Sequence, residues 1–235
     1  MHDGATAQVG GGGGRRWPVV AGAAALALAA GLGVVALVAR SGDDEPALAP
    51  GLDPSLSAAT QASLVVLGPD DGPAGFDWFG PGLLTEEPLC PAAAPLSDQT
   101  PAGASDLAAF HGSGQRFTAK ALVLPEREQA IEALEIDREA FRLCSEPAGD
   151  GGSAALTVFP WDDVDIPGAD EVYTVAYSYG PSATRPAEWL AVCRVSNVNV
   201  IATGTDPGRT QHFARVMTAR AAGLPEPSLV DENTG

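Results

Sequence analysis

The chain has 235 residues and is strongly acidic, with 13 Lys and Arg against 30 Asp and Glu and a formal net charge of −17. Phosphate backbones repel such a chain, so the composition excludes a nucleic-acid-binding protein. The three histidines and three cysteines do not cluster at the short spacings that a zinc site requires. We therefore expect no metal and no cofactor.

The first predicted element is an uncharged stretch of 23 residues, 17–39. As a helix it would extend roughly 34 Å, enough to cross the ~30 Å hydrocarbon core of a bilayer. A secretory signal has a shorter apolar region and a small-x-small cleavage site, but Leu37 stands where the small residue should be. The pattern predicts an uncleaved transmembrane signal anchor, with cleavage near Ser41 as the alternative.

Basic residues flank this stretch unequally. Arg15 and Arg16 precede it and Arg40 follows it, which favours a cytoplasmic N-terminus and an extracytoplasmic C-terminal part. The predicted cytoplasmic tail, residues 1–16, contains a glycine run and is too short for a folded domain. We therefore expect a single-pass protein of the cell membrane that acts outside the cytoplasm.

Composition divides the rest of the chain into three parts. Residues 40–61 are rich in Ala, Pro, Leu and Asp without clear periodicity, as is typical of a flexible linker. Residues 62–224 are enough for one extracytoplasmic domain with its own core. Residues 225–235 are predicted to be a flexible tail.

The domain is predicted to contain a strand, a helix, four strands and a second helix, in that order. The first strand covers 115–124, and the helix that follows, 125–144, begins with Pro125 and an acidic first turn. Ser196-Asn197 predicts a tight hairpin between the last two strands. We expect an α+β fold in which an antiparallel sheet of about five strands is covered by two helices on one face. The remaining strands are predicted at 155–159, 172–179, 189–195 and 198–204, and the last helix at 207–222.

The part of the domain ahead of residue 115 carries weaker signals. An apolar run at 63–67 ends in a Gly/Pro cluster, and 68–103 is predicted to be loop-rich. The sequence HGSG at 111–114 lacks the G-x-S-x-G nucleophile elbow and is also predicted to be a loop. His212, at the start of the last predicted helix, is expected at the surface. We predict no catalytic residue in either histidine-containing stretch.

The three cysteines are Cys90, Cys144 and Cys193. Disulfides form and persist outside the cytoplasm. Cys90 lies in the predicted loop and Cys144 at the end of the first predicted helix, so a bridge between them would tie the loop to the core. We predict that pair, with Cys193 buried and free in its strand. An intermolecular disulfide or a reactive thiol is the alternative for Cys193.

Two further groups of residues are candidates for chemistry. The acidic stretch 161–171 fits the ligand spacing of a calcium loop only in part, so a solvated loop is predicted and adventitious calcium is the alternative. Trp78 and Phe79, in a loop flanked by Gly and Pro, are speculative ligand-binding residues; core packing is the alternative for the aromatics. The aromatics that would line such a cleft are Trp78, Phe79, Trp161, Tyr177, Tyr179 and Trp189.

The linear order of several motifs resembles the extracellular sensor-domain family of actinobacteria, typified by the PknH kinase ectodomain and related mycobacterial lipoproteins. The motifs are LGPDDGPAGF at 67–76, Cys90-Pro91, the helix ending in Cys144 and VCRVSNVNVIAT at 192–203. The resemblance implies an α+β ligand-binding domain whose loops are held by disulfides. Ser196 departs from the family, which usually has glycine in that turn, and only one disulfide can form here.

Three functions remain open on the sequence. The first is a membrane-anchored extracytoplasmic ligand-binding or sensor-like domain without catalytic activity. The second is a structural or protein-interaction module of the cell envelope that binds no small ligand. The third is an envelope hydrolase with an unrecognised site. The expected partner is an unknown small ligand or another envelope protein.

Overall fold

The computed structural model describes residues 48–80, 89–147, 154–161 and 164–228. The predicted cytoplasmic tail and signal anchor therefore lie outside the described residues. Within the described ranges, no helix combines the length and the apolar character needed to cross a membrane.

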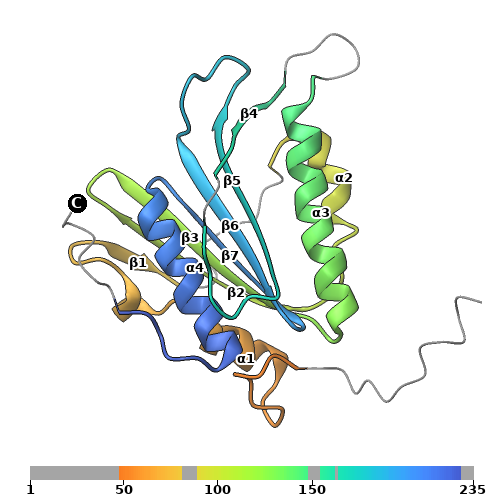
Figure 1. The fold of residues 1–235 in the computed structure, drawn as a ribbon, viewed down its shortest axis with the longest axis vertical. Helices are drawn as coiled ribbons and strands as arrows, with labels where there is room; N and C mark the ends of the chain where they lie inside the picture. The colour runs from red at the N-terminus through yellow and green to blue at the C-terminus, as the bar shows by residue number, and fades with distance from the viewer. Residues whose placement is uncertain (1–47, 81–88, 148–153, 162–163, 229–235) are drawn as a thin grey trace, which may run out of the picture. The chain divides into compact units, whose positions relative to one another are not determined.

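Seven strands form one antiparallel sheet in the order β1-β2-β3-β7-β6-β5-β4 (Figure 1). The turn Ser113-Gly114 joins β2 to β3, and Ser196-Asn197 joins β6 to β7 as the sequence predicted. The strands are β1 (Asp77–Phe79), β2 (Ala104–Gly112), β3 (Gln115–Val123), β4 (Leu156–Phe159), β5 (Glu171–Tyr179), β6 (Glu188–Val195) and β7 (Val198–Gly204).

The sheet has two strands more than the sequence predicted. Strand β1 lies in the stretch that was predicted to be loop, and strand β2 begins just after it. The HGSG sequence is no loop either, because His111 and Gly112 end β2 and the next two residues form the hairpin turn. The prediction was wrong because β1 has only three residues and β2 carries small alanines, so both are strands through pairing with their neighbours rather than by propensity.

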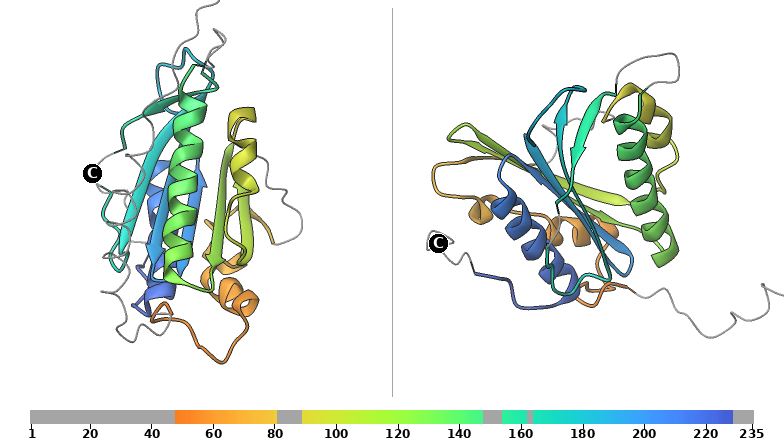
Figure 2. Two further views of the ribbon diagram at one scale, coloured as in Figure 1. Left: turned by 90° about the vertical axis from the view of Figure 1, so that its right-hand side faces the viewer. Right: turned by 45° about the horizontal axis from the view of Figure 1, so that its top comes forward.

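Helices cover both faces of the sheet, not one (Figures 1 and 2). Helices α1 (Ala58–Val65) and α4 (Pro207–Ala222) lie on one face, and α3 (Arg127–Ser145) lies on the other. The single-face prediction was wrong because β6 and β7 are buried on both sides: every residue from 190 to 200 is buried. A strand that is apolar on both faces needs a layer of helix on each.

The core under α1 and α4 is built around phenylalanines. The ring of Phe213 on α4 lies 5.4 Å from the rings of both Phe110 on β2 and Phe117 on β3. The core under α3 is smaller and includes Leu134, Phe141 and the sheet residues that face them. The short helices η1 (Pro69–Asp71), η2 (Pro91–Ala93) and α2 (Ala94–Ser97) complete the described elements.

The predicted helices agree with the structure to within two residues. Helix α4 has the predicted bounds, with Asp206 accepting a hydrogen bond from the backbone of Arg209 at its N-cap and Gly223 ending it at a φ of 66°. The apolar run at 63–67 is the end of α1 and the two buried residues that follow it.

Residues 48–52, which we call the incoming segment, dock on the end of the sheet formed by the β6–β7 hairpin. The side chain of Asn197 accepts a hydrogen bond from the amide of Ala49 (2.9 Å) and donates one to the carbonyl of Leu124 (2.7 Å). The amide of Gly51 donates to the carbonyl of Ala221 at the end of α4 (2.8 Å). The folded domain therefore begins before residue 62, within the range that was predicted to be linker.

Candidate binding site

One line of residues crosses the sheet on the face that carries α3. Strand register places Asp77 beside His111 and His111 beside Arg116. Arg116 is joined through its backbone to Thr205, and register places Glu188 beside Tyr177. We call this set the polar row: Asp77, His111, Arg116, Thr205, Glu188 and Tyr177. Its members come from six different segments and meet only in the folded sheet.

The middle of the polar row is a hydrogen-bonded network around Glu188. The Glu188 side chain is only 9% exposed, and the guanidinium of Arg116, which is 61% exposed, forms an ion pair with it. The hydroxyl of Tyr177 donates to the other carboxylate oxygen (2.6 Å). Burial raises the pKa of Tyr177, so its hydroxyl stays protonated and remains a donor. A buried carboxylate requires such partners.

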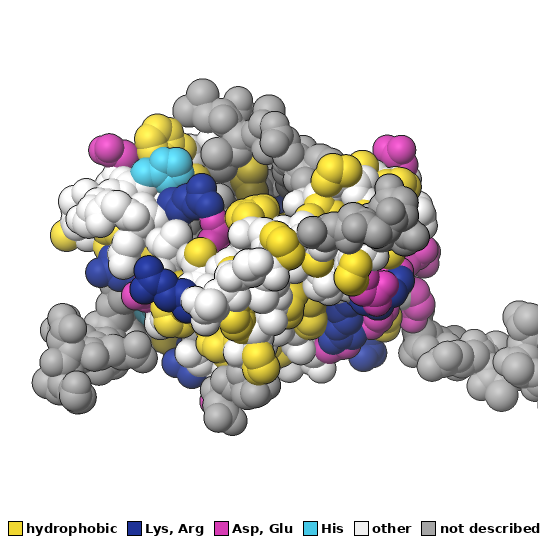
Figure 3. Space-filling model, turned by 90° about the horizontal axis from the view of Figure 1, so that it is seen from above, with side chains coloured by type: hydrophobic (Ala, Val, Ile, Leu, Met, Phe, Trp, Pro, Cys, Tyr) yellow, Lys and Arg dark blue, Asp and Glu magenta, His cyan; other side chains and the backbone are white. Residues whose placement is uncertain are grey.

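Aromatic rings flank the network on both sides. The ring of Phe79 lies 5.1 Å from that of His111 on one side, and the ring of Tyr179 lies 5.8 Å from that of Tyr177 on the other. Tyr179 is 60% exposed, so its ring offers an apolar surface to a bound molecule. At this end of the molecule, histidine, basic and acidic side chains lie together on the surface (Figure 3).

The residues next to the polar row on the same face differ between strands in whether they pack against α3. On β5 and β6 the residues behind the row, Val175 and Leu190, pack with α3 in the apolar core. On β2, β3 and β7 the equivalent positions are Ala109, Thr118 and Thr203, which register places side by side. The half-exposed hydroxyl side chains of Thr118 and Thr203 therefore extend the polar surface beyond the row.

Strand β1 places Trp78 and Phe79 on opposite faces of the sheet, because successive strand residues point in opposite directions. Phe79 faces the polar row and contacts His111. Trp78 is aligned with Phe110, whose ring belongs to the core on the other face. Only Phe79 adjoins the polar row, and ligand binding by either residue stays a prediction.

The other aromatic candidates also divide between the two faces. Tyr177 and Tyr179 lie at the polar row, whereas Trp161 packs against the core under α1 and α4. Sequence reasoning missed the central pair, Arg116 and Glu188. Arg116 stands at the start of one predicted strand and Glu188 immediately before another, and no spacing along the chain links the two, since they are 72 positions apart.

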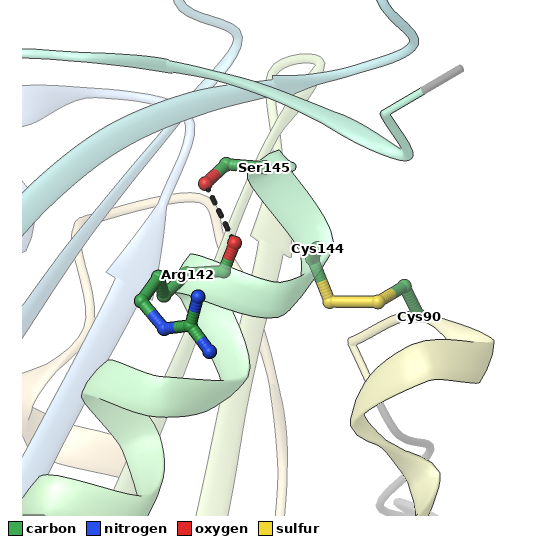
Figure 4. Close-up of a disulfide and its surroundings, with 4 residues drawn as sticks. All are labelled: Cys90, Arg142, Cys144 and Ser145. Atoms are coloured by element: carbon green, nitrogen blue, oxygen red, sulfur yellow. Dashed lines mark hydrogen bonds between the residues drawn. A yellow bond between two sulfur atoms is a disulfide. The ribbon is translucent and has the colours of Figure 1, made fainter. Parts of the chain in front are cut away.

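The predicted disulfide between Cys90 and Cys144 is confirmed (Figure 4). Both cysteines are buried, and their Cα atoms lie 5.9 Å apart. The bridge ties η2 to the last turn of α3, one turn beyond Phe141, whose ring lies 5.3 Å from that of Tyr177. The disulfide therefore secures the end of α3 that packs against the polar row.

Cys193 is free and buried, as predicted, and faces α4. Burial raises the pKa of its thiol to about 12. A thiol of that pKa is almost wholly protonated at neutral pH and is a poor nucleophile. This environment favours the structural interpretation of Cys193 over the reactive one.

In the acidic stretch 161–171, the carboxylates of Asp170 and Glu171 pair with arginines; Asp162 and Asp163 lie outside the described residues. Asp170 accepts hydrogen bonds from Arg194 (3.0 Å) and from the amide of Ser196 (2.7 Å), and Glu171 pairs with Arg138 (2.8 Å). Within the part of the chain that the structure describes, no group of His, Cys, Asp and Glu could hold a metal ion. His212, expected at the surface, is half-buried beside Phe213 on α4.

No protein-family model matches this chain, and no curated protein matches it significantly. Among solved structures it is similar to the extracellular domain of PknH from Mycobacterium tuberculosis, at 13% identity and a TM-score of 0.48, over 71% of this chain and 95% of that one. It is also similar to a putative uncharacterized protein from Mycobacterium smegmatis, the Rv0999 ortholog, at 17% identity and a TM-score of 0.35, over 72% of this chain and 98% of that one. The first is the kind of domain that the sequence motifs resemble.

Proposed function

We propose that this chain is a membrane-anchored, extracytoplasmic, sensor-like domain that binds a small polar ligand along the polar row and catalyses no reaction. The network of Arg116, Glu188 and Tyr177 carries this proposal. It holds an exposed guanidinium in a fixed position by means of a buried carboxylate, between two aromatic surfaces. Fixed polar groups beside apolar surface are what small-molecule sites generally present.

The groups of the polar row suit recognition better than bond-breaking. Glu188 is bonded to both Arg116 and Tyr177, which leaves its carboxylate poorly placed to accept a proton from a substrate. The raised pKa of Tyr177 keeps that side chain a donor rather than a base. The same network holds Arg116 in one orientation, so less entropy is lost when a ligand binds there.

Two observations favour an extracytoplasmic location. The Cys90–Cys144 disulfide is of a kind that persists outside the cytoplasm. The second is the uncharged stretch 17–39, which predicts a signal anchor.

The chain enters the domain at the end of the sheet remote from the polar row (Figure 1). The incoming segment docks on the β6–β7 hairpin, whereas Glu188 lies at the opposite end of β6, roughly 23 Å away at 3.3 Å per residue. A ligand can therefore approach the row without contacting the incoming segment.

A path of direct contacts joins the row to helix α3. Glu188 is bonded to Tyr177, the ring of Tyr177 packs on Phe141, and the last turn of α3 is fixed by the disulfide at Cys144. A ligand that shifts Arg116 or Glu188 would change the packing of α3. This contact path is what makes the binding module sensor-like.

Native mass spectrometry of the full chain, isolated from its own membranes without reduction, tests the proposal. We expect an additional mass that is lost on denaturation and is absent from the variant Arg116→Gln/Glu188→Gln. The matched control is Arg142→Gln, which alters an exposed arginine on α3 and should keep the mass. A bare chain that forms a specific crosslink to another envelope protein would instead support the protein-interaction module.

A further inference from the structure

We propose that the ligand of the polar row is an anion, bound through a carboxylate or phosphate group by Arg116 and His111. This inference rests on the proposed function, because it specifies the chemistry of the same site. It is carried by the distribution of charge on the sheet, by the position of the Arg116 guanidinium and by the hydroxyl groups around it.

Basic side chains are concentrated on this part of a strongly acidic chain. Although the net charge is −17, the α3 face of β1, β2, β3 and β7 carries His111, Arg116 and Lys120, which is the only lysine of the sequence; the carboxylates of the polar row are Asp77 on β1 and Glu188 on the adjoining strand β6. Asp77 lies at the edge strand, beside His111. A local cluster of basic side chains on an acidic protein attracts anions to one place while the remaining surface repels them.

The guanidinium of Arg116 is available to a second acceptor. Its ion pair with Glu188 is formed through the Nη2 group, and the side chain is 61% exposed. Within the described residues, this is the one side-chain partner of the guanidinium. Arginine offers five N–H donors in a planar fork that matches a carboxylate or a phosphate, so donors remain for a bound anion.

The surroundings of the guanidinium supply further hydrogen-bond donors. His111 lies directly across from Arg116 on β2. The hydroxyl side chains of Thr118 and Thr203 occupy the next positions on the same face, and both are half-exposed. Hydroxyl, imidazole and guanidinium groups are the side chains that commonly donate to oxyanions.

Glu188 has two opposing roles in this site. It holds Arg116 in place, and it also competes with any anion for the same guanidinium. Replacing Glu188 with the isosteric, neutral Gln should therefore tighten anion binding, whereas replacing Arg116 with Gln should weaken it. A site that recognises an uncharged ligand gives no reason for the two substitutions to act in opposite directions.

The test is a titration of the full chain in detergent micelles, followed by amide NMR at constant ionic strength. The probes are inorganic phosphate and citrate, with trehalose as an uncharged comparison. We expect saturable shifts at Phe79, His111 and Thr118, at least about ten-fold weaker binding in Arg116→Gln and binding about five-fold tighter in Glu188→Gln. Phosphate or citrate, whichever binds more tightly, identifies the preferred group.

Two further variants distinguish a loss of anion binding from a loss of the folded structure. Arg116→Gln leaves Glu188 with Tyr177 alone, so the double variant Arg116→Gln/Glu188→Gln, which buries no unpaired charge, should also lose anion binding. Arg142→Gln should bind as wild type. Unchanged anion binding in the double variant, or no shift at this face with either anion, overturns the inference.

Trehalose distinguishes the failure of this inference from that of the proposed function. If trehalose shifts the same resonances as strongly as the anions do, the polar row is a binding site but its ligand is not selected by charge. That result overturns the anion inference and leaves the proposed function standing. The native mass spectrometry of the chain isolated from its own membranes tests the proposed function independently.

Discussion

Reduction of the Cys90–Cys144 disulfide should make the domain markedly easier to unfold. The two cysteines are separated by 54 positions, so the bridge closes a loop of about 55 residues. In the chain-entropy relation this restricts the unfolded chain by about 14 cal/mol/K, or about 4 kcal/mol at 25 °C. For a domain of this size, a loss of about 4 kcal/mol corresponds to a fall in Tm of about 8–16 °C.

Urea denaturation of the full chain in micelles, with and without the reductant TCEP at pH 7, measures this loss. The matched control is Cys90→Ala/Cys144→Ala, which should be destabilised to a similar degree and should not respond to TCEP. Since Cys90 and Cys144 are the only bridged pair in the described chain, any further effect of TCEP on the control would point to another reducible bond. A loss below about 1 kcal/mol in the reduced wild type would refute the reasoning, because the loop would then be constrained without the bridge.

Three further substitutions or conditions have defined outcomes. Gly204→Ala should cost about 1–3 kcal/mol in urea denaturation, because a Cβ there would overlap the ring of Phe117, whereas Gly68→Ala should be nearly neutral, because its Cβ would lie at an ordinary contact distance, 3.7 Å from Oδ2 of Asp71. Cys193 should resist iodoacetamide at pH 8 until the chain unfolds, as judged by mass spectrometry. The protonated thiol should stabilise the fold fully below the usual thiol pKa of 9.0, and this contribution should be lost as the pH rises towards about 12. Cys193→Ala should not show this loss. An equal pH dependence of the free energy of unfolding in the wild type and the variant would contradict the prediction. Asn197→Ala removes two buried hydrogen bonds, so it should cost about 2–4 kcal/mol and speed amide exchange in residues 48–52, and unchanged exchange there would disprove this role of the side chain.

The C-terminal half of the fold could be predicted because its signals are local. Strands β6 and β7 are long apolar runs separated by a turn, and helix α4 has a capping aspartate, a proline at its start and a glycine after its end. The disulfide could be predicted because one cysteine lay in a loop and the other at a helix end, while Cys193 lay within a strand. In each case the deciding residues are close in sequence to the element that they define.

The strands and the site that were missed depend on long-range pairing. Strands β1 and β2 carry too little apolar alternation to be recognised alone; β2 is a strand through its pairing with β3, and β1 through its pairing with β2. The helices on both faces follow from the burial of β6 and β7 on both sides, which a short apolar run does not distinguish from burial on one side. The polar row depends on register across six segments, so Arg116 and Glu188 become neighbours only once the order of the sheet is known.

Amide hydrogen exchange of the full chain as isolated from its membranes, compared with the same chain after its ligand has been removed, tests the central claim most directly. The claim is that the domain binds its ligand at the polar row. The account predicts that the ligand slows exchange in residues 77–79, 109–118 and 203–205 and at the end of α3, where Phe141 packs on Tyr177. Protection confined to α1, α4 or the incoming segment, or no difference between the two preparations, would contradict it.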